Sequence, residues 1–475
     1  MKNLFLPLLA LTLLNISARA QQTQINAGII APCVDERVEL TSIAARLAEY
    51  DEYSMDLNKV YVQDIHLYFD KYKDHPLIQY MKKIRDSNEI GFDAVAFMAV
   101  HLTQPPALMP VVKFSASVPE KRWGASTAMK FDTLLRQFYN DTHFEEFYKA
   151  HQPVYAKAIM SFDSVYRQLD VNWYYKYYGI KPRGSFNIII GLGNGGANYG
   201  PKVIFPDGSE KLYAIMGSWQ FNKASEPVFG DKDYLPTLIH EFNHSFVNYL
   251  TEEHLAQLQA AADTIYKAVA PEMKHLAYGD AKTMLSEAMV RASVIRYMMV
   301  HYKDTTAATK ETQDQTALGF VWMKQLVELL GTYEANRQTY PTLESFMPRV
   351  IDFYASTATR INTILSDYRK NLPHVASLEP AINKDTTVSP DLKQLKVVFD
   401  KTMLGRGYSI SAGHLGDDHY GVKKVIGYTD DNKAVLLELD LKPNTEYDFI
   451  ITGRSFRSAD GYHLQNYEVM FKTGK

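Results

Sequence analysis

The chain of 475 residues predicts an α+β fold, in which a mostly helical domain with a small β-sheet precedes an all-β domain. Three observations support this prediction. Apolar residues recur at helical spacing through most of the chain, two β-branched runs lie near its middle, and short alternating strands come last. We expect a first domain over 21–375 and a β-sandwich domain over 376–475.

Residues 1–20 have the composition of a signal peptide. Lys2 precedes an apolar run over 4–14, and Ala18 and Ala20 supply the small residues of a cleavage site. The mature protein is therefore expected to begin just after Ala20 and to be exported, to the periplasm or outside the cell. Because the run is too short to span a bilayer and no later stretch is longer, no integral membrane segment is predicted.

The net charge and the cysteine content limit the partners and the sources of stability that we expect. The formal net charge is −3, so the chain offers no large basic surface and nucleic acid is not an expected partner. Cys33 is the only cysteine, so no intramolecular disulfide can form. The hydrophobic core must therefore supply the stability.

The helical N-terminal part of the first domain is expected over 34–180. Apolar residues at helical spacing predict helices at Glu36–Leu47, Phe92–Leu102 and Met129–Tyr148. The aromatic run Trp173–Tyr178 is predicted to belong to the core, because such runs pack in protein interiors more often than they line a substrate cleft.

Two strands and a glycine-rich loop open the catalytic part, expected over 181–370. The runs Ser185–Gly191 and Lys211–Gly217 predict a small sheet. The loop Gly191–Gly196 satisfies the GxGxxG pattern, but the turn-forming residues after it leave no helix to receive a dinucleotide phosphate. We therefore reject a nucleotide site and expect the loop to rim the active-site cleft.

The apolar segment Leu235–Leu250 contains the most informative motif of the chain, which is His240-Glu241-Phe242-Asn243-His244. Positions i and i+4 share one face of a helix, so both imidazoles can bind one zinc ion while Glu241 reaches a water bound to it. Pro236 suits the first turn of this helix, and Asp233 is expected to cap it. The alternative is a core helix whose histidines bond to backbone carbonyls, although such burial without a metal is unfavourable.

A catalytic zinc ion needs a third protein ligand from elsewhere. Where metzincins have a glycine and a third histidine, this chain has Val247 and Leu250, which excludes that subclass. Glu287 is preferred, because it lies at the edge of the apolar face of a helix predicted over Ala281–Tyr302, one turn before Arg291. A Glu287–Arg291 ion pair is the structural alternative, and it is compatible with ligation because Arg291 can orient the carboxylate. Weaker substitutes for the third ligand are Asp280, Glu272 and His275.

Helices continue to about residue 370, and strands follow. Further helices are predicted at Glu253–Ala270, Gln315–Leu330 and Leu343–Leu365. Leu372–Pro380 is expected to be a linker. Beyond it, alternating patterns predict a β-sandwich of immunoglobulin type, with strands at Gln394–Phe399, Ala434–Leu439, Tyr447–Ile451 and Tyr467–Phe471.

Three parts of the chain resemble known families. The motif at 240–244, with Ser286-Glu287-Ala288 and Arg291-Ala292 downstream, resembles the gluzincin arrangement of zinc metallopeptidases, which implies a zincin-like fold. The stretch from Val34-Asp35-Glu36-Arg37-Val38-Glu39-Leu40 through Arg291 resembles a family of exported bacterial proteins of unknown function with peptidase-like motifs. Leu441–Tyr447 and Asp460-Gly461 are similar to the bacterial Ig-like domains appended to secreted enzymes.

The motif and these resemblances imply a metallopeptidase with one zinc ion and a peptide or protein substrate. The ion would lower the pKa of a bound water to about 7, and Glu241 would act as the general base. The expected ligands are His240, His244 and Glu287. Candidates for stabilising the transition state or supporting a ligand are Arg291, Tyr278 and His275.

Two other functions stay open at this point. One is a zinc amidase that acts on a substrate other than a peptide. The other is an exported surface-binding protein in which the Ig-like domain is the working part and the metal site is structural or degenerate. The base at Glu241 argues against the latter, since a structural site closed by four ligands needs no base. The substrate, the cleavage preference and the oligomeric state are also open.

Overall fold

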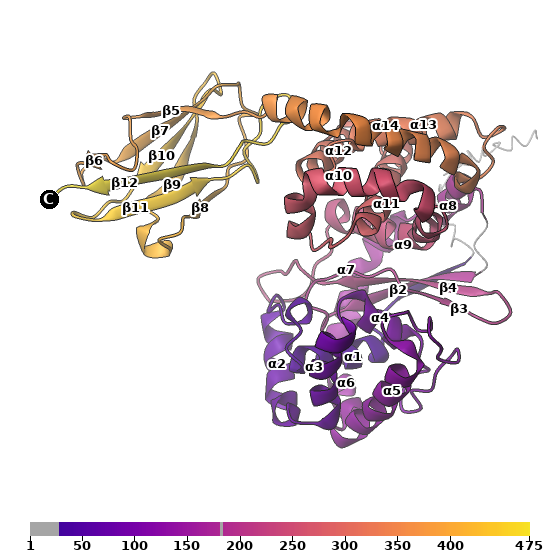
Figure 1. Cartoon of the computed structure of the whole chain (residues 1–475). Coiled ribbons are helices and arrows are strands. Elements are labelled where there is room, and N and C mark those ends of the chain that lie inside the picture. Colours follow the sequence, from indigo (N-terminus) through magenta and orange to yellow (C-terminus); the bar gives the residue numbers. More distant parts are fainter. Residues whose placement is uncertain (1–27, 181–183) are drawn as a thin grey trace, which may run out of the picture.

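A computed structural model describes residues 28–180 and 184–475 (Figure 1). As predicted, the fold mixes helices with small sheets: helices surround one four-stranded sheet, and two further four-stranded sheets lie at the C-terminal end. The predicted signal peptide, residues 1–20, lies outside the described residues. No helix in the described part of the chain combines the length and the apolarity that crossing a bilayer requires.

The helices within residues 36–150 lie on one side of the central sheet, whereas the helix over 171–178 lies on the side of α9 (Asp231–Glu253) (Figure 1). The helix predicted over Met129–Tyr148 is in fact two helices, because His143 adopts a left-handed conformation with φ of 51° and interrupts it. The aromatic run Trp173–Tyr178 contributes four buried rings to the core, as predicted. The helices are α1 (Glu36–Leu47), α2 (Lys59–Phe69), α3 (Pro76–Asn88), α4 (Asp93–Val100), α5 (Gly124–Asp141), α6 (Phe144–Ala150), α7 (Gln152–Gln168) and α8 (Val171–Tyr178).

The central sheet contains both predicted strands, in the order β1-β2-β4-β3. Strand β2 (Gly184–Gly191) pairs in parallel with β4 (Glu210–Gly217) and with β1 (Ile29–Cys33), and β3 (Lys202–Ile204) adds an antiparallel edge. Strand β1 was not predicted, because a short segment that contains Pro32 carries little strand signal. Its position is decided by pairing with residues far along the chain.

Glu39 of α1 anchors the glycine-rich loop that follows β2. Its buried carboxylate accepts hydrogen bonds from the backbone N–H groups of Leu192 (2.8 Å) and Gly193 (3.3 Å) and from the Tyr61 hydroxyl (2.7 Å). Burial raises the pKa of Glu39, and these three donors oppose that effect. The two loop amides are therefore already used by a protein carboxylate and do not face a ligand.

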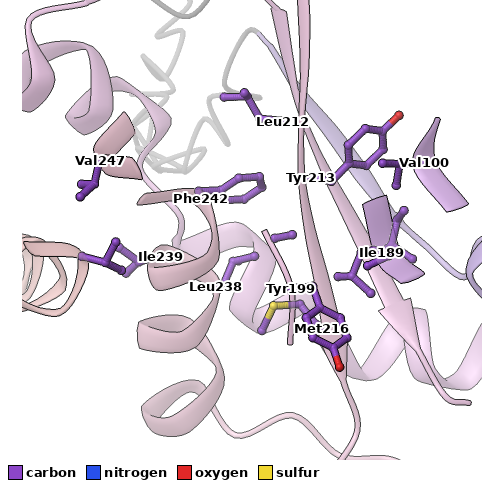
Figure 2. Packing of buried hydrophobic residues seen from close by; sticks show 14 of the residues in the cluster. Val100, Ile189, Tyr199, Leu212, Tyr213, Met216, Leu238, Ile239, Phe242 and Val247 are labelled. Atoms are coloured by element: carbon purple, nitrogen blue, oxygen red, sulfur yellow. The ribbon is translucent and has the colours of Figure 1, made fainter. Parts of the chain in front are cut away.

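The long helix α9 (Asp231–Glu253) packs one apolar side on the central sheet. Figure 2 shows Leu238 and Phe242 pointing toward the strands, whereas Ile239 and Val247 point to the opposite side. All four side chains are buried. The sheet and the helices beyond α9 thus hold it from two sides.

The start of α9 differs from the prediction. The helix begins at Asp231, so Pro236 lies inside it instead of in its first turn. Asp233 does not cap the helix, and its carboxylate accepts a hydrogen bond from the Gln220 side chain (2.7 Å). Two acidic residues in the first turn favour this earlier start, because they interact well with the positive end of the helix dipole.

The helices after α9 form the layer on the other side of the sheet, and α14 extends toward the C-terminal strands (Figure 1). The single helix predicted over Gln315–Leu330 is wrong: α12 ends at Ala317 and α13 begins at Met323. Gly319 lies between them with φ of 108°, a conformation that ends a helix. The helices are α10 (Leu255–His275), α11 (Ala281–His301), α12 (Thr306–Ala317), α13 (Met323–Ala335) and α14 (Leu343–Lys370).

The C-terminal strands form two sheets that share a hydrophobic cluster of their own, with strand orders β5-β7-β10-β9 and β6-β12-β11-β8. The predicted linker Leu372–Pro380 contains a strand, because Val375–Glu379 pairs antiparallel with Gln394–Phe399. All four predicted strands are present, and the immunoglobulin type stays a prediction. The strands are β5 (Val375–Glu379), β6 (Thr387–Val388), β7 (Gln394–Phe399), β8 (Ile410–Ala412), β9 (Val422–Tyr428), β10 (Ala434–Leu439), β11 (Glu446–Ile451) and β12 (Tyr467–Thr473).

A charged contact joins α12 to the segment between β11 and β12. Asp314 pairs with Arg457, and its carboxylate lies 3.4 Å from Nε2 of His463. Lys310, one turn earlier on α12, lies 2.6 Å from the same carboxylate. Burial alone would raise the pKa of Asp314, but these three partners outweigh burial and hold the pKa below its ordinary value.

We predict that this contact weakens in acid. Because the pKa of Asp314 is lowered in the folded protein, the contact gives its full stabilisation at pH values above 3.8, the ordinary pKa of aspartate. This stabilisation is lost as the pH falls below 3.8 toward the lowered pKa. Asp314→Asn should remove the contact already at neutral pH, which hydrogen exchange of residues 457–463 would report as faster exchange than in the parent. Asp367→Asn, on an exposed position of α14, is the control. Equal exchange in Asp314→Asn and the parent at pH 7 would contradict the prediction.

Candidate metal centre

Helices α9 and α11 bring the three predicted ligands together. His240 and His244 lie one turn apart on α9, and Glu287 lies on α11, which packs against α9. The Nε2 atoms of the two imidazoles are 3.1 Å apart, and each is 3.6 Å from an oxygen of the Glu287 carboxylate. These side chains could hold a metal ion, since one ligand atom from each lies within 4.8 Å of the others.

The separations fit a small divalent ion. Zinc binds imidazole and carboxylate at about 2.0 to 2.2 Å in a tetrahedral arrangement, which places ligand atoms roughly 3.3 Å apart. Nδ1 of His244 lies 3.2 Å from the amide oxygen of Asn248 and therefore carries the hydrogen, which leaves a lone pair on Nε2. Burial lowers the pKa of His240 to about 3, so this imidazole is neutral at neutral pH.

Tyr278 and Arg291 hold the carboxylate of Glu287 in place. The Tyr278 hydroxyl donates to Oε2 of Glu287 (2.8 Å), and Nε of Arg291 donates to the same oxygen (3.3 Å). A second nitrogen of Arg291 donates to the Tyr278 hydroxyl (2.6 Å). Burial would raise the pKa of Glu287, but the imidazoles, Arg291 and Tyr278 outweigh it, so the pKa lies below its ordinary value. The Glu287–Arg291 ion pair thus coexists with the approach of Glu287 to the histidines.

Glu241 and the two histidines line one cavity, whose volume is about 410 Å³. Its side chain is buried, and burial raises the pKa of Glu241 to about 7. The cavity is also lined by Tyr278 and Arg291, so both of these predicted residues lie at the centre. A carboxylate next to the candidate ligands is therefore available to exchange a proton.

Other sequence-based candidates lie elsewhere. His275 is exposed at the end of α10 and is not among the residues that line the cavity. Asp280 caps α11 by accepting hydrogen bonds from the backbone N–H and the hydroxyl of Thr283. Glu272 also lies outside the group that could hold a metal. The structure therefore brings Glu287, and none of these substitutes, to the two histidines.

Sequence reasoning missed Asn198, Glu311 and Gln315, which also line the cavity. Gln315 accepts a hydrogen bond from Arg291 (2.8 Å) and donates one to Glu311 (2.6 Å). These residues come from a loop and from α12, and no fixed spacing connects them with the motif. Asn248 could have been found, because it lies one turn after His244 on the same helix.

Asn243, inside the motif, fixes α9 to its neighbours. It is fully buried, its amide oxygen accepts a hydrogen bond from the Tyr178 hydroxyl (2.8 Å), and its amide nitrogen donates to the Val290 carbonyl on α11 (3.4 Å). Gly200 lies so close to the Glu241 carbonyl that a Cβ atom would collide with it. The glycine-rich segment therefore reaches the centre at its end, near Asn198 and Gly200, while its beginning is bound to Glu39.

Comparison with protein families gives a match over most of these elements. The family described as "Domain of unknown function (DUF4932)" matches residues 30–353. The chain belongs to this family. The DUF4932 region contains most of the central sheet and both helices of the candidate metal centre, and the C-terminal strands from β5 onward lie outside it.

Other comparisons add no functional information. No curated protein matches the chain significantly. The crystal structure of the S-layer protein rSbsC(31-844) is similar at 12% identity over 84% of this chain, with a TM-score of 0.16, and this chain spans only 46% of it. The N-terminal part of the bacterial S-layer protein SbsC gives 13% identity, 84% and 79% coverage, and a TM-score of 0.15. TM-scores this low carry no argument about fold or function.

We predict that two asparagines on α9 differ sharply in their effect on stability. Asn243→Ala should lower the free energy of unfolding by about 1 to 3 kcal/mol, because it leaves the buried Tyr178 hydroxyl without its acceptor. Asn248→Ala, at an exposed position of the same helix, should change it by less than about 0.5 kcal/mol. Denaturant unfolding followed by circular dichroism measures both, and equal losses in the two variants would contradict this account.

Proposed function

We propose that the chain is an exported zinc-dependent peptidase with a zincin-like DUF4932 region. The observation that carries the proposal is the approach of two imidazole nitrogens and one carboxylate, 3.1 to 3.6 Å apart, beside a buried glutamate. Two imidazole nitrogens and one carboxylate are the donor set that a hydrolytic zinc ion takes. In this proposal residues 1–20 are removed on export, and 376–475 form an Ig-like sandwich.

The side chains have separate roles in this proposal. His240, His244 and Glu287 would hold one zinc ion, which supplies Lewis acidity toward water and toward the scissile carbonyl when it is bound. A carboxylate oxygen of Glu241 accepts the proton of the attacking water and returns it to the leaving amine. Tyr278 and Arg291 keep the Glu287 carboxylate ionised and oriented, as their hydrogen bonds to Oε2 support.

The surroundings favour an enzyme over a structural metal site. A structural zinc ion is closed off by four protein ligands, whereas here three candidate ligands border a cavity of about 410 Å³. Polar side chains, among them Asn198 and Gln315, line this cavity. They give a polar substrate such as a peptide groups to which it can hydrogen-bond.

We predict that Glu241→Gln and His240→Ala separate catalysis from metal binding. Glu241→Gln should keep the zinc content of the parent and lower peptide hydrolysis by at least about 100-fold, because an amide cannot accept the proton. His240→Ala should bind one zinc ion fewer per chain and lose hydrolysis as well. Digestion of a peptide library with and without a chelator, combined with elemental analysis, measures both properties.

Glu253→Gln, at an exposed position near the end of α9, is the matched control and should retain zinc and activity. If Glu241→Gln cleaved peptides at the parent rate, Glu241 would not be the base. If the zinc-loaded parent cleaved no peptide but hydrolysed another amide in a chelator-sensitive way, the proposal would change to an amidase. If it bound zinc and hydrolysed neither, the surface-binding alternative would replace it.

A further inference from the structure

A second group of possible metal ligands lies in the C-terminal sandwich, and it is independent of the proposed peptidase site. It consists of His414, Asp448 and Glu468, with one ligand atom from each within 4.8 Å of the others. Nδ1 of His414 lies 2.6 Å from Oδ2 of Asp448 and 3.6 Å from Oε1 of Glu468. Asp448 is on β11 and Glu468 on β12, which are paired strands, and His414 is in the loop after β8.

The Asp448 carboxylate is buried on the side of its sheet that faces away from the sandwich core. Its neighbours Tyr447 and Phe449 point into the hydrophobic cluster, so Asp448 points outward, as alternation along a strand requires. The side chain is nevertheless 0% exposed, because the loop that contains His414 folds over it. A Cβ atom at Gly413 would collide with the carboxylate, so this loop can lie against Asp448 only with glycine at that position.

One oxygen of this buried carboxylate has no partner. Oδ2 of Asp448 accepts from the backbone N–H of Leu415 (3.2 Å) and pairs with His414. Oδ1 has no hydrogen-bond partner and is shielded from solvent. Buried carboxylate oxygens are normally paired, so the Asp448 carboxylate, which lies beside a histidine and near a second carboxylate, keeps bonding capacity that a cation can fill.

We propose that His414, Asp448 and Glu468 bind a divalent transition-metal ion, with Zn²⁺ the ion that fits best. One imidazole nitrogen and two carboxylates favour zinc over calcium or magnesium, which take all-oxygen sites. The ion replaces the His414–Asp448 hydrogen bond and gives the buried Asp448 carboxylate a permanently charged partner. The side chains of His414 and Glu468 are 61% and 51% exposed, so the ion reaches the site from solvent. Its effect is to fix the loop after β8 to strands β11 and β12.

The test is the zinc content and the thermal stability of the full-length chain. After dialysis against micromolar Zn²⁺, His414→Ala and Glu468→Gln should each weaken binding of one ion by at least about tenfold relative to the parent. Added Zn²⁺ should raise the melting temperature of the sandwich in the parent and much less in these variants. Both positions are exposed, so the fold should be retained. Glu446→Gln, an exposed glutamate on β11, should behave like the parent.

His240→Ala separates this proposal from the peptidase proposal, because it removes only the ion of the first centre. The double variant His240→Ala/His414→Ala should then bind one ion fewer than His240→Ala alone. Equal zinc content in these two variants would overturn the inference. So would equal stabilisation of the parent and His414→Ala by Zn²⁺, and the His414–Asp448 contact would then be an ion pair only. If His240→Ala lost peptidase activity while His414→Ala still lowered the zinc content, the inference about the C-terminal site would stand.

Discussion

The contact between α9 and α11 is the constraint on which the centre depends. It places a carboxylate from α11 against two imidazoles on α9, in a position from which water is largely excluded. Burying an ionised carboxylate is strongly unfavourable unless charge and hydrogen bonds compensate. Arg291 and Tyr278 provide that compensation on one side of Glu287, and the histidines face it on the other. The protein fold itself thus sets the arrangement of these three candidate ligands.

The sequence predicted the centre better than it predicted its surroundings. The i,i+4 histidines and Glu287 could be found because helical periodicity determines which side chains share a face. The break between α12 and α13 and strands β1 and β5 were missed, because a left-handed residue or long-range pairing decides them. The start of α9 was missed because the acidic residues of its first turn come before Pro236. Asn198, Glu311 and Gln315 reach the cavity from elements that no local pattern connects with α9.

The hydrogen-bond partners of three buried carboxylates, those of Glu39, Glu287 and Asp448, indicate different roles for these residues. Glu39 is satisfied by two backbone amides and a tyrosine hydroxyl, so it is structural and holds the glycine-rich loop. Glu287 accepts hydrogen bonds on one side only, and its other side faces the imidazoles of His240 and His244. Asp448 has an oxygen with no partner at all. Unlike Glu39, Glu287 and Asp448 therefore keep bonding capacity for a further partner.

The most direct test of the central claim is anomalous diffraction at the zinc edge from crystals of the full-length protein grown with Zn²⁺. We predict a peak about 2.0 to 2.2 Å from Nε2 of His240, Nε2 of His244 and the Glu287 carboxylate. Crystals that contain zinc but show no peak between α9 and α11, with Glu287 bonded only to Arg291 and Tyr278, would contradict it.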